Sequence, residues 1–242
     1  MMYDYKEHYD SFYRGKGAYH WIRGDTEVVD IIRGHFLTKT DGKLLDVGCG
    51  DGWVLSHFTK DFTCYGVDVS KVAIDLAKQR FSEHGLKAKF EVRSATKLRY
   101  ADNQFDVVLF IDCIEHLTLE DGVRALNEIY RVLKPGGEVI ICTPNLCDEY
   151  VIDKSDVPEA LRKVLPDKIK NSDFSEPEHH LHEYEREELK NVVESCGFSI
   201  QRSGVGGCLC VVVGGYIGCE KVCDFEFIIP YDKQFICATK TC

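Results

Sequence analysis

The sequence predicts an α/β fold in which a doubly wound, mostly parallel β-sheet carries helices on both faces and an antiparallel strand at one edge. Three observations support this prediction. Short apolar runs alternate with amphipathic stretches through most of the chain, which is the pattern of parallel strands joined by helices. The run at 106–111 is almost entirely apolar, as expected for a strand covered on both faces. From residue 198 onward the chain is β-rich without intervening helices, which indicates the antiparallel addition.

The first half of the chain divides into elements at clear sequence signals. Apolar residues gathered on one side of 26–36 predict a helix, and the short apolar runs at 43–47 and 63–69 predict the first two strands. A helix is expected at 53–60, directly after the first strand. Another helix should follow Ser70, because its hydroxyl can bind the free N–H groups of a first helical turn.

The second half is interpreted in the same way. Alternating polar and apolar residues at 87–92 predict the third strand. Thr118 and Asp121 have the spacing of a capping box, which predicts the start of an amphipathic helix. The Lys-Pro-Gly-Gly segment at 134–137 should end that helix, and a buried strand is expected at 138–143.

Length and composition fit one domain. A chain of 242 residues that is 44% hydrophobic and 29% charged can bury the core of a single α/β domain. The aromatic-rich residues 1–40, which include His20 and Trp21, are predicted to form a cap over the substrate or cofactor. Residues 145–184 are highly charged with poor periodicity, which indicates an insertion or lid. The last helix should end at Gly197 in the left-handed cap position.

The charge balance narrows the classes of partner. The formal net charge is -10, whereas a general nucleic-acid binder usually carries a basic excess or patch, so nucleic acid and anionic membranes are both disfavoured. No run reaches the about 18 apolar residues that a membrane-spanning helix needs. Residues 1–10 lack the apolar centre of a signal peptide. The expected location is the cytoplasm.

The twelve cysteines are scattered along the chain rather than spaced as a disulfide framework. Without a secretory signal, reduced and mostly buried thiols are the favoured interpretation. Cys208 and Cys210 are two residues apart, and Cys219 and Cys223 are four apart. A Cys-x-Cys spacing is unusual for zinc, so core or strand cysteines are expected here.

The most informative segment is the glycine-rich turn Leu-Leu-Asp-Val-Gly-Cys-Gly-Asp-Gly at 44–52, where a predicted strand leads into a helix. Glycines there let the chain turn tightly and let a ligand approach the backbone, and the helix start offers unpaired N–H groups. The dinucleotide pattern G-x-G-x-x-G, counted from Gly48 and Gly50, requires a third glycine at the position of Trp53. A dehydrogenase is therefore disfavoured.

The pattern D-x-G-x-G-x-G in this turn resembles the signature loop of class I S-adenosylmethionine-dependent methyltransferases. Asp68 ends the next predicted strand, twenty residues after Gly48. Further segments that resemble the family follow in the family's order, at 101–108, 111–117, 131–137, 182–189 and 196–198. The resemblance covers roughly residues 40–200 and implies a seven-stranded sheet.

The resemblance also implies S-adenosylmethionine as methyl donor and S-adenosylhomocysteine as product. In the family, the first acid and the glycines surround the methionine end of the cofactor, and the acid after the second strand accepts the ribose hydroxyls. Ser94 stands where many relatives carry an aspartate that faces the adenine amine. The cofactor-binding residues so expected are Asp46, Gly48, Cys49, Gly50, Asp68, Val69, Ser94, Ala95, Thr96, Ile111 and Asp112. Asp46 has the alternative role of orienting the glycine loop, and Asp68 that of capping the following helix.

A sulfonium methyl group is a strong electrophile, so such an enzyme mainly aligns the acceptor and excludes water. A general base helps where the acceptor is a hydroxyl or a protonated amine. His116, after the fourth strand, and His180, on the insertion, are the predicted catalytic residues. A structural role at a helix start is the alternative for His116. The other candidates are Asp112, Glu115, His179 and His182.

Three functions follow as hypotheses. The first is methylation of an O or N atom of a small-molecule acceptor without a metal, as in the broad group that includes the ubiquinone-pathway O-methyltransferases. The second rests on Asp112, Glu115, His116 and His180, which resemble the metal-binding set of small-RNA 3′-terminal ribose 2′-O-methyltransferases; two carboxylates and two imidazoles suit a divalent cation. The third is a catalytically silent relative that binds a partner. The intact glycine loop argues against this third hypothesis.

Overall fold

The computed structural model describes residues 5–16, 27–144, 150–151, 168–169, 180–212, 216–217, 220–221 and 227–240. His20 and Trp21 of the predicted cap lie outside the described residues. So do His179, Cys219, Cys223 and most of the predicted insertion at 145–184. Within this part of the chain, no helix has the length and apolar character needed to cross a membrane.

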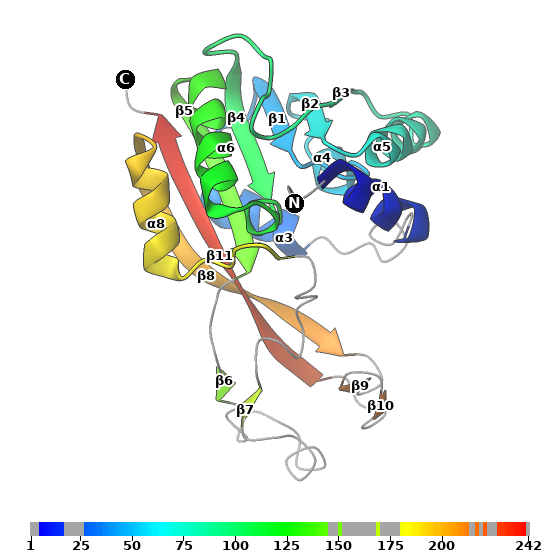
Figure 1. Cartoon of the computed structure of the whole chain (residues 1–242), viewed down its shortest axis with the longest axis vertical. Coiled ribbons are helices and arrows are strands. Elements are labelled where there is room, and N and C mark those ends of the chain that lie inside the picture. The colour runs from blue at the N-terminus through cyan, green and yellow to red at the C-terminus, as the bar shows by residue number, and fades with distance from the viewer. Residues whose placement is uncertain are drawn as a thin grey trace.

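A seven-stranded sheet forms the centre of the molecule, in the order β3-β2-β1-β4-β5-β11-β8 (Figure 1). The strands are β1 (Lys43–Val47), β2 (Thr63–Asp68), β3 (Ala88–Val92), β4 (Phe105–Ile111), β5 (Leu133–Pro144), β8 (Phe198–Val212) and β11 (Phe227–Lys240). The first five pair in parallel, and β11 runs antiparallel to β5 and β8. The predicted doubly wound, mostly parallel sheet is therefore confirmed. The antiparallel strand, β11, is second from the edge, because β8 pairs along its outer side.

Helices cover both faces of the sheet (Figure 1). Their bounds are α1 (Tyr5–Lys16), α3 (Glu27–Ile31) with the π-helical turn η1 (Ile32–Phe36), α4 (Trp53–Ser56), α5 (Lys71–Glu83), the 3-10 turn η2 (Ile114–His116), α6 (Leu119–Val132) and α8 (Arg186–Ser195). Neighbouring strand residues point to opposite faces. Leu45 and Val108 accordingly pack with residues of α6 and α8, whereas Leu44 and Val107 pack with residues of α3, α4 and α5. The sheet thus separates two buried cores.

The structure has the helix starts and the helix end that the sequence predicts at Ser70, Thr118 and Gly197. The Ser70 Oγ accepts a bond from Ala73 N at 3.1 Å at the start of α5. The Thr118 Oγ1 accepts one from Asp121 N at 3.2 Å at the start of α6. Gly197 has φ 92°, the left-handed conformation expected after α8. Each signal acts over a few residues, so the local sequence was sufficient to find it.

Two boundaries differ from the sequence-based expectation. Helix α4 ends at Ser56 rather than near residue 60, where turns continue the segment. Strand β5 begins immediately after α6, because Leu133 already pairs with Phe105 of β4. The Lys-Pro-Gly-Gly segment that follows shifts the register of the β4–β5 pairing. The structure also describes four two-residue strands, which are β6 (Tyr150–Val151), β7 (Lys168–Ile169), β9 (Tyr216–Ile217) and β10 (Glu220–Lys221).

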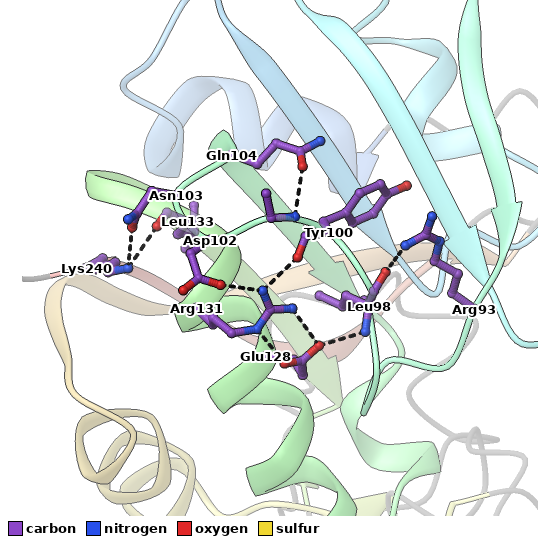
Figure 2. A network of polar contacts seen from close by, with 11 residues as sticks. Arg93, Leu98, Tyr100, Asp102, Asn103, Gln104, Glu128, Arg131, Leu133 and Lys240 are labelled. Atoms are coloured by element: carbon purple, nitrogen blue, oxygen red, sulfur yellow. Dashed lines mark hydrogen bonds and ion pairs between the residues drawn. The ribbon is translucent and has the colours of Figure 1, made fainter.

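The loop between β3 and β4 is tied to α6 by a polar network (Figure 2). The Arg131 guanidinium donates to the Tyr100 carbonyl and to Asp102 Oδ1, each at 2.7 Å, and pairs with Glu128. The Glu128 Oε2 also accepts a bond from Leu98 N at 2.8 Å. These contacts attach to α6 the loop that also contains Ser94, where the sequence predicts contact with adenine.

Candidate active site

A cavity of about 490 Å³ opens at the carboxyl ends of β1, β2 and β4. The strand order reverses at this place, which is where open α/β sheets bind their ligands. All the predicted cofactor residues except Asp46 line the cavity, together with both predicted catalytic histidines, His116 and His180. The structure thus brings together residues at the carboxyl ends of four different strands, β1 to β4, and a segment beyond residue 179.

The glycine turn is held against β2 by its backbone. Gly48 N and Cys49 N both donate to the Val67 carbonyl, at 2.8 and 3.0 Å. Gly48 and Gly50 have φ 79° and 52°, a left-handed conformation that favours glycine. A Cβ added to Gly48 would lie 2.5 Å from the Sγ of Cys113, which also lines the cavity. The turn therefore leaves no room for a side chain there.

Asp68 lies at the end of β2 with its carboxylate fixed by two backbone donors. Its Oδ2 accepts a bond from Gly50 N at 3.0 Å, and its Oδ1 accepts one from Ser70 N at 2.8 Å. Burial raises its pKa to about 6. Each carboxylate oxygen can accept a second bond, so the fixed carboxylate suits two neighbouring hydroxyl donors such as those of a ribose.

Asp46 occupies the end of β1, outside the residues that line the cavity, and is only 3% exposed. Burial, followed by the negative charge of Asp68, raises its pKa to about 7. Its position two residues before Gly48 fits the alternative role of supporting the glycine turn better than direct contact with a ligand.

The raised pKa of Asp46 predicts a pH-dependent stability. The folded state holds this proton more tightly than the unfolded chain, so the contribution is full below about pH 4 and is lost as the pH rises to about 7. Asp46→Asn is therefore expected to raise the free energy of unfolding of the unliganded protein by roughly 1–3 kcal/mol at pH 8 and to change it little near pH 4. Urea unfolding at both pH values checks this.

Asp75→Asn provides the matched control for that experiment, because the Asp75 side chain is 56% exposed and pairs with Lys71 on the surface. We expect it to leave the pH dependence unchanged. A destabilised Asp46→Asn protein at pH 8 would contradict the prediction.

Ser94 is engaged within its own turn. Its Oγ lies 2.8 Å from Thr96 Oγ1 and accepts a bond from Thr96 N at 3.2 Å. The neighbouring Arg93 donates to Glu91 Oε1 at 2.8 Å and lies 4.2 Å from the centre of the Tyr100 ring. This turn is thus built from short local contacts. Ser94 and Thr96 both line the cavity, and Ser94 stands where the resemblance implies an aspartate.

The far end of the cavity is formed where residues 180–182 meet η2. Leu181 N and His182 N both donate to the Glu115 carbonyl, at 2.8 and 3.1 Å. This contact places the imidazole of His180 beside that of His116, with ring centres 5.0 Å apart. His182 instead contacts Glu188, with Nε2 2.9 Å from Oε1, and does not line the cavity.

The polar groups at this end are held by neighbours. The Thr143 hydroxyl donates to the Glu115 Oε2 at 2.9 Å. Glu115 is 1% exposed, and burial together with the charge of Asp112 raises its pKa to about 7. The His180 Nδ1 lies 2.7 Å from the Glu183 Oε1. Because a carboxylate only accepts, this contact places a proton on Nδ1, and Nε2 is then the acceptor of the neutral imidazole.

One atom from each of Glu115, His116 and His180 lies within 4.8 Å of the others, a spacing that can hold a metal ion. These are three of the four residues of the metal-binding hypothesis. The fourth, Asp112, also lines the cavity but is exposed and does not belong to this cluster.

Helix α1 supplies a wall that motif reasoning did not include among the site residues. Tyr9, Phe12 and Tyr13 line the cavity, and the Tyr9 ring meets His116 edge to face at 5.6 Å between centres. The aromatic composition of the first residues was the available signal, although it also fitted core packing. Other lining residues beyond the predicted set include Asp51, Trp53, Val54, Arg93, Cys113, Leu117, Asp121 and Pro144.

Comparisons with known proteins agree with this geometry. Residues 45–141 match the family model described as a methyltransferase domain. Norajmaline N-methyltransferase of Rauvolfia serpentina is 33% identical over 134 residues, which are 52% of this chain and 45% of the relative. Phosphoethanolamine N-methyltransferase 3 of Arabidopsis thaliana is 41% identical over 110 residues, which are 43% of this chain and 21% of the relative. The matched part therefore spans less than half the length of these curated relatives.

The fold is shared with solved structures. Phosphoethanolamine N-methyltransferase 2 of Haemonchus contortus, in complex with S-adenosyl-L-methionine, has a TM-score of 0.67 at 18% identity, covering 100% of this chain and 61% of that one. A SAM-dependent methyltransferase from Methanosarcina mazei has a TM-score of 0.57 at 23% identity, covering 87% of this chain and 97% of that one.

Proposed function

We propose that this chain, which belongs to the class I S-adenosylmethionine-dependent methyltransferases, transfers a methyl group to an amine nitrogen of a small-molecule acceptor. The observation that carries the proposal is that one cavity holds both the predicted cofactor residues and a pair of imidazoles. Asp68, the glycine turn and the Ser94 turn would hold the cofactor, which supplies an electrophilic methyl group when bound.

The chain's own groups would orient the acceptor and remove its proton. The Nε2 of His180 is the available acceptor, because its Nδ1 faces the Glu183 carboxylate at 2.7 Å. That carboxylate would stabilise the imidazolium formed when Nε2 takes the proton. His116, in ring contact with both His180 and Tyr9, would fix the orientation of the pair. The rings of α1 line the cavity and would limit the access of water to the acceptor.

Three observations favour nitrogen over oxygen. Acidic side chains outnumber the single arginine among the described residues that line the cavity; they are Asp51, Asp68, Asp112, Glu115 and Asp121. Aromatic rings of Tyr9, Phe12, Tyr13 and Trp53 line the same space, and such faces attract cationic amines. The curated relatives named above are N-methyltransferases. Charge, aromatic surface and relatives therefore support the same class of acceptor.

Labelled methyl transfer from S-adenosylmethionine to paired panels of amines and matching alcohols tests this proposal. We expect transfer to amines, and a loss of about 100-fold in kcat for His180→Ala. His84→Ala is the matched control, because His84 is an exposed histidine at the end of α5, and it should retain full activity. Transfer to alcohols only, or full activity of His180→Ala, would contradict the proposal.

A second candidate is supported by the cluster of Glu115, His116 and His180, whose ligand atoms converge within 4.8 Å. In this alternative, a divalent cation bound there would assist 2′-O-methylation of a terminal ribose of RNA. The net charge of -10 argues against RNA as the partner. Two experiments separate these functions: calorimetric titration with S-adenosylhomocysteine, and activity assays with EDTA or added Mn²⁺. Methylation of amines without a metal supports the first proposal. Loss of activity in EDTA supports the second.

A further inference from the structure

The N-terminal helix α1 carries one acidic residue that is almost fully buried. Asp10 is 5% exposed, whereas most of the described side chains of α1 are exposed or half-buried. Its Oδ1 accepts a bond from Ser70 Oγ at 2.6 Å and one from Val72 N at 3.2 Å. Its Oδ2 accepts a bond from Lys6 Nζ at 2.8 Å. Asp10 therefore binds the first turn of α5, where α1 and α5 pack side by side (Figure 1).

This contact is electrostatically favourable and specific. A carboxylate at a helix start binds free N–H groups and the positive end of the helix dipole. Ser70 binds Ala73 N within its own helix, and Asp10 binds Val72 N from a different helix. The bonds from Lys6 and Ser70 lower the pKa of Asp10 well below its usual range. The charged form thus holds the two helices together.

Asp10 is connected to the predicted cofactor site by consecutive hydrogen bonds. Its Oδ1 binds the Ser70 hydroxyl, Ser70 N binds Asp68 Oδ1, and Asp68 Oδ2 binds Gly50 N. The chain from α1 through the end of β2 to the glycine turn is therefore continuous. Each of these groups is thus held by the one before it.

The residues on either side of Asp10 form the wall of the cavity. Tyr9 reaches the ring of His116 at 5.6 Å between centres. The Tyr13 hydroxyl occupies the space that a Cβ on Gly50 would take. Both rings come from the turn of helix that Asp10 holds in place, so release of Asp10 would withdraw them from both ends of the cavity together.

We propose that Asp10 is a positioning residue that holds α1 closed over the cofactor cavity, so that S-adenosylmethionine enters and S-adenosylhomocysteine leaves when the Asp10–Ser70 contact breaks. This inference rests on the proposed methyltransferase function. Asp10, which does not line the cavity, would thus control the exchange of ligands.

The rate of S-adenosylhomocysteine dissociation tests the proposal. Trp53 lines the cavity, so its fluorescence is a suitable signal for stopped-flow measurements on the full chain. Asp10→Ala is expected to increase the dissociation rate about tenfold, as for the loss of charge-assisted hydrogen bonds. Asp10→Asn keeps one acceptor oxygen for Ser70 and Val72, so a smaller increase is expected. Asp75→Ala removes an exposed carboxylate from α5 and should leave the rate unchanged.

Hydrogen exchange of the amides of residues 5–16 provides a second readout. In the wild type, S-adenosylhomocysteine should slow exchange across α1, and in Asp10→Ala it should have little effect there. Failure of the wild type to bind S-adenosylhomocysteine would overturn the proposed function. Normal binding with wild-type dissociation rates and wild-type protection of α1 in both Asp10 variants would overturn the role of Asp10 alone.

Discussion

Asp68→Ala is expected to weaken S-adenosylhomocysteine binding by about 100-fold, because hydrogen bonds to a charged acceptor are among the strong ones in proteins. The carboxylate also holds Gly50 N and Ser70 N at 3.0 and 2.8 Å. Its removal would therefore take away the proposed acceptor for the ribose hydroxyls and the acceptor that holds the glycine turn. Isothermal titration calorimetry at pH 8 measures the change.

Asp68→Asn is the informative companion variant, because its amide retains one oxygen acceptor of similar size. We expect it to bind more tightly than Asp68→Ala and more weakly than the wild type. The pH dependence gives an independent check: with a pKa of about 6, the wild-type carboxyl becomes protonated as the pH falls below that value, and affinity should fall with it. Wild-type affinity in Asp68→Ala would show that this acid caps α5 rather than binding the cofactor.

The sequence was sufficient for features that depend on nearby residues or on strand order. Ser70 and Thr118 cap their helices because the capping interaction spans three residues. Gly48, Asp68 and Asp112 converge because each follows a parallel strand, and the carboxyl ends of neighbouring strands lie at one edge of the sheet. The glycine-rich turn and the family resemblance predicted these residues as the site, and the strand order of the structure explains why they meet.

Contacts between distant segments had no comparable local signal. His180 meets His116 only because two backbone bonds attach residues 181 and 182 to Glu115. Asp10 lies in a helix rich in polar residues, where an acidic side chain is expected to be exposed to solvent. It is buried because α1 packs on α5. Such side chains become part of a site through tertiary packing, which the spacing of residues along the chain does not encode.

Gly48→Ala is expected to abolish detectable S-adenosylhomocysteine binding and to destabilise the fold by about 3 kcal/mol. Two costs add at this position. The φ of 79° is unfavourable for any residue with a Cβ, by about 1–2 kcal/mol. The new Cβ would also lie 2.5 Å from Cys113 Sγ and 2.9 Å from Cys113 Cβ, so Cys113 must move. Because Cys113 lines the cavity, this movement changes the space where the cofactor would bind.

Gly85→Ala separates these two costs. Gly85 has φ 66°, and an added Cβ would meet nothing within 4 Å, so only the backbone strain remains. Thermal unfolding should show a loss of about 1 kcal/mol for Gly85→Ala, with wild-type binding of S-adenosylhomocysteine by calorimetry. The larger loss in Gly48→Ala then measures the close packing of the turn against Cys113. Equal stability and equal binding in the two variants would mean that the turn tolerates a side chain, which would remove the steric basis for placing the cofactor against it.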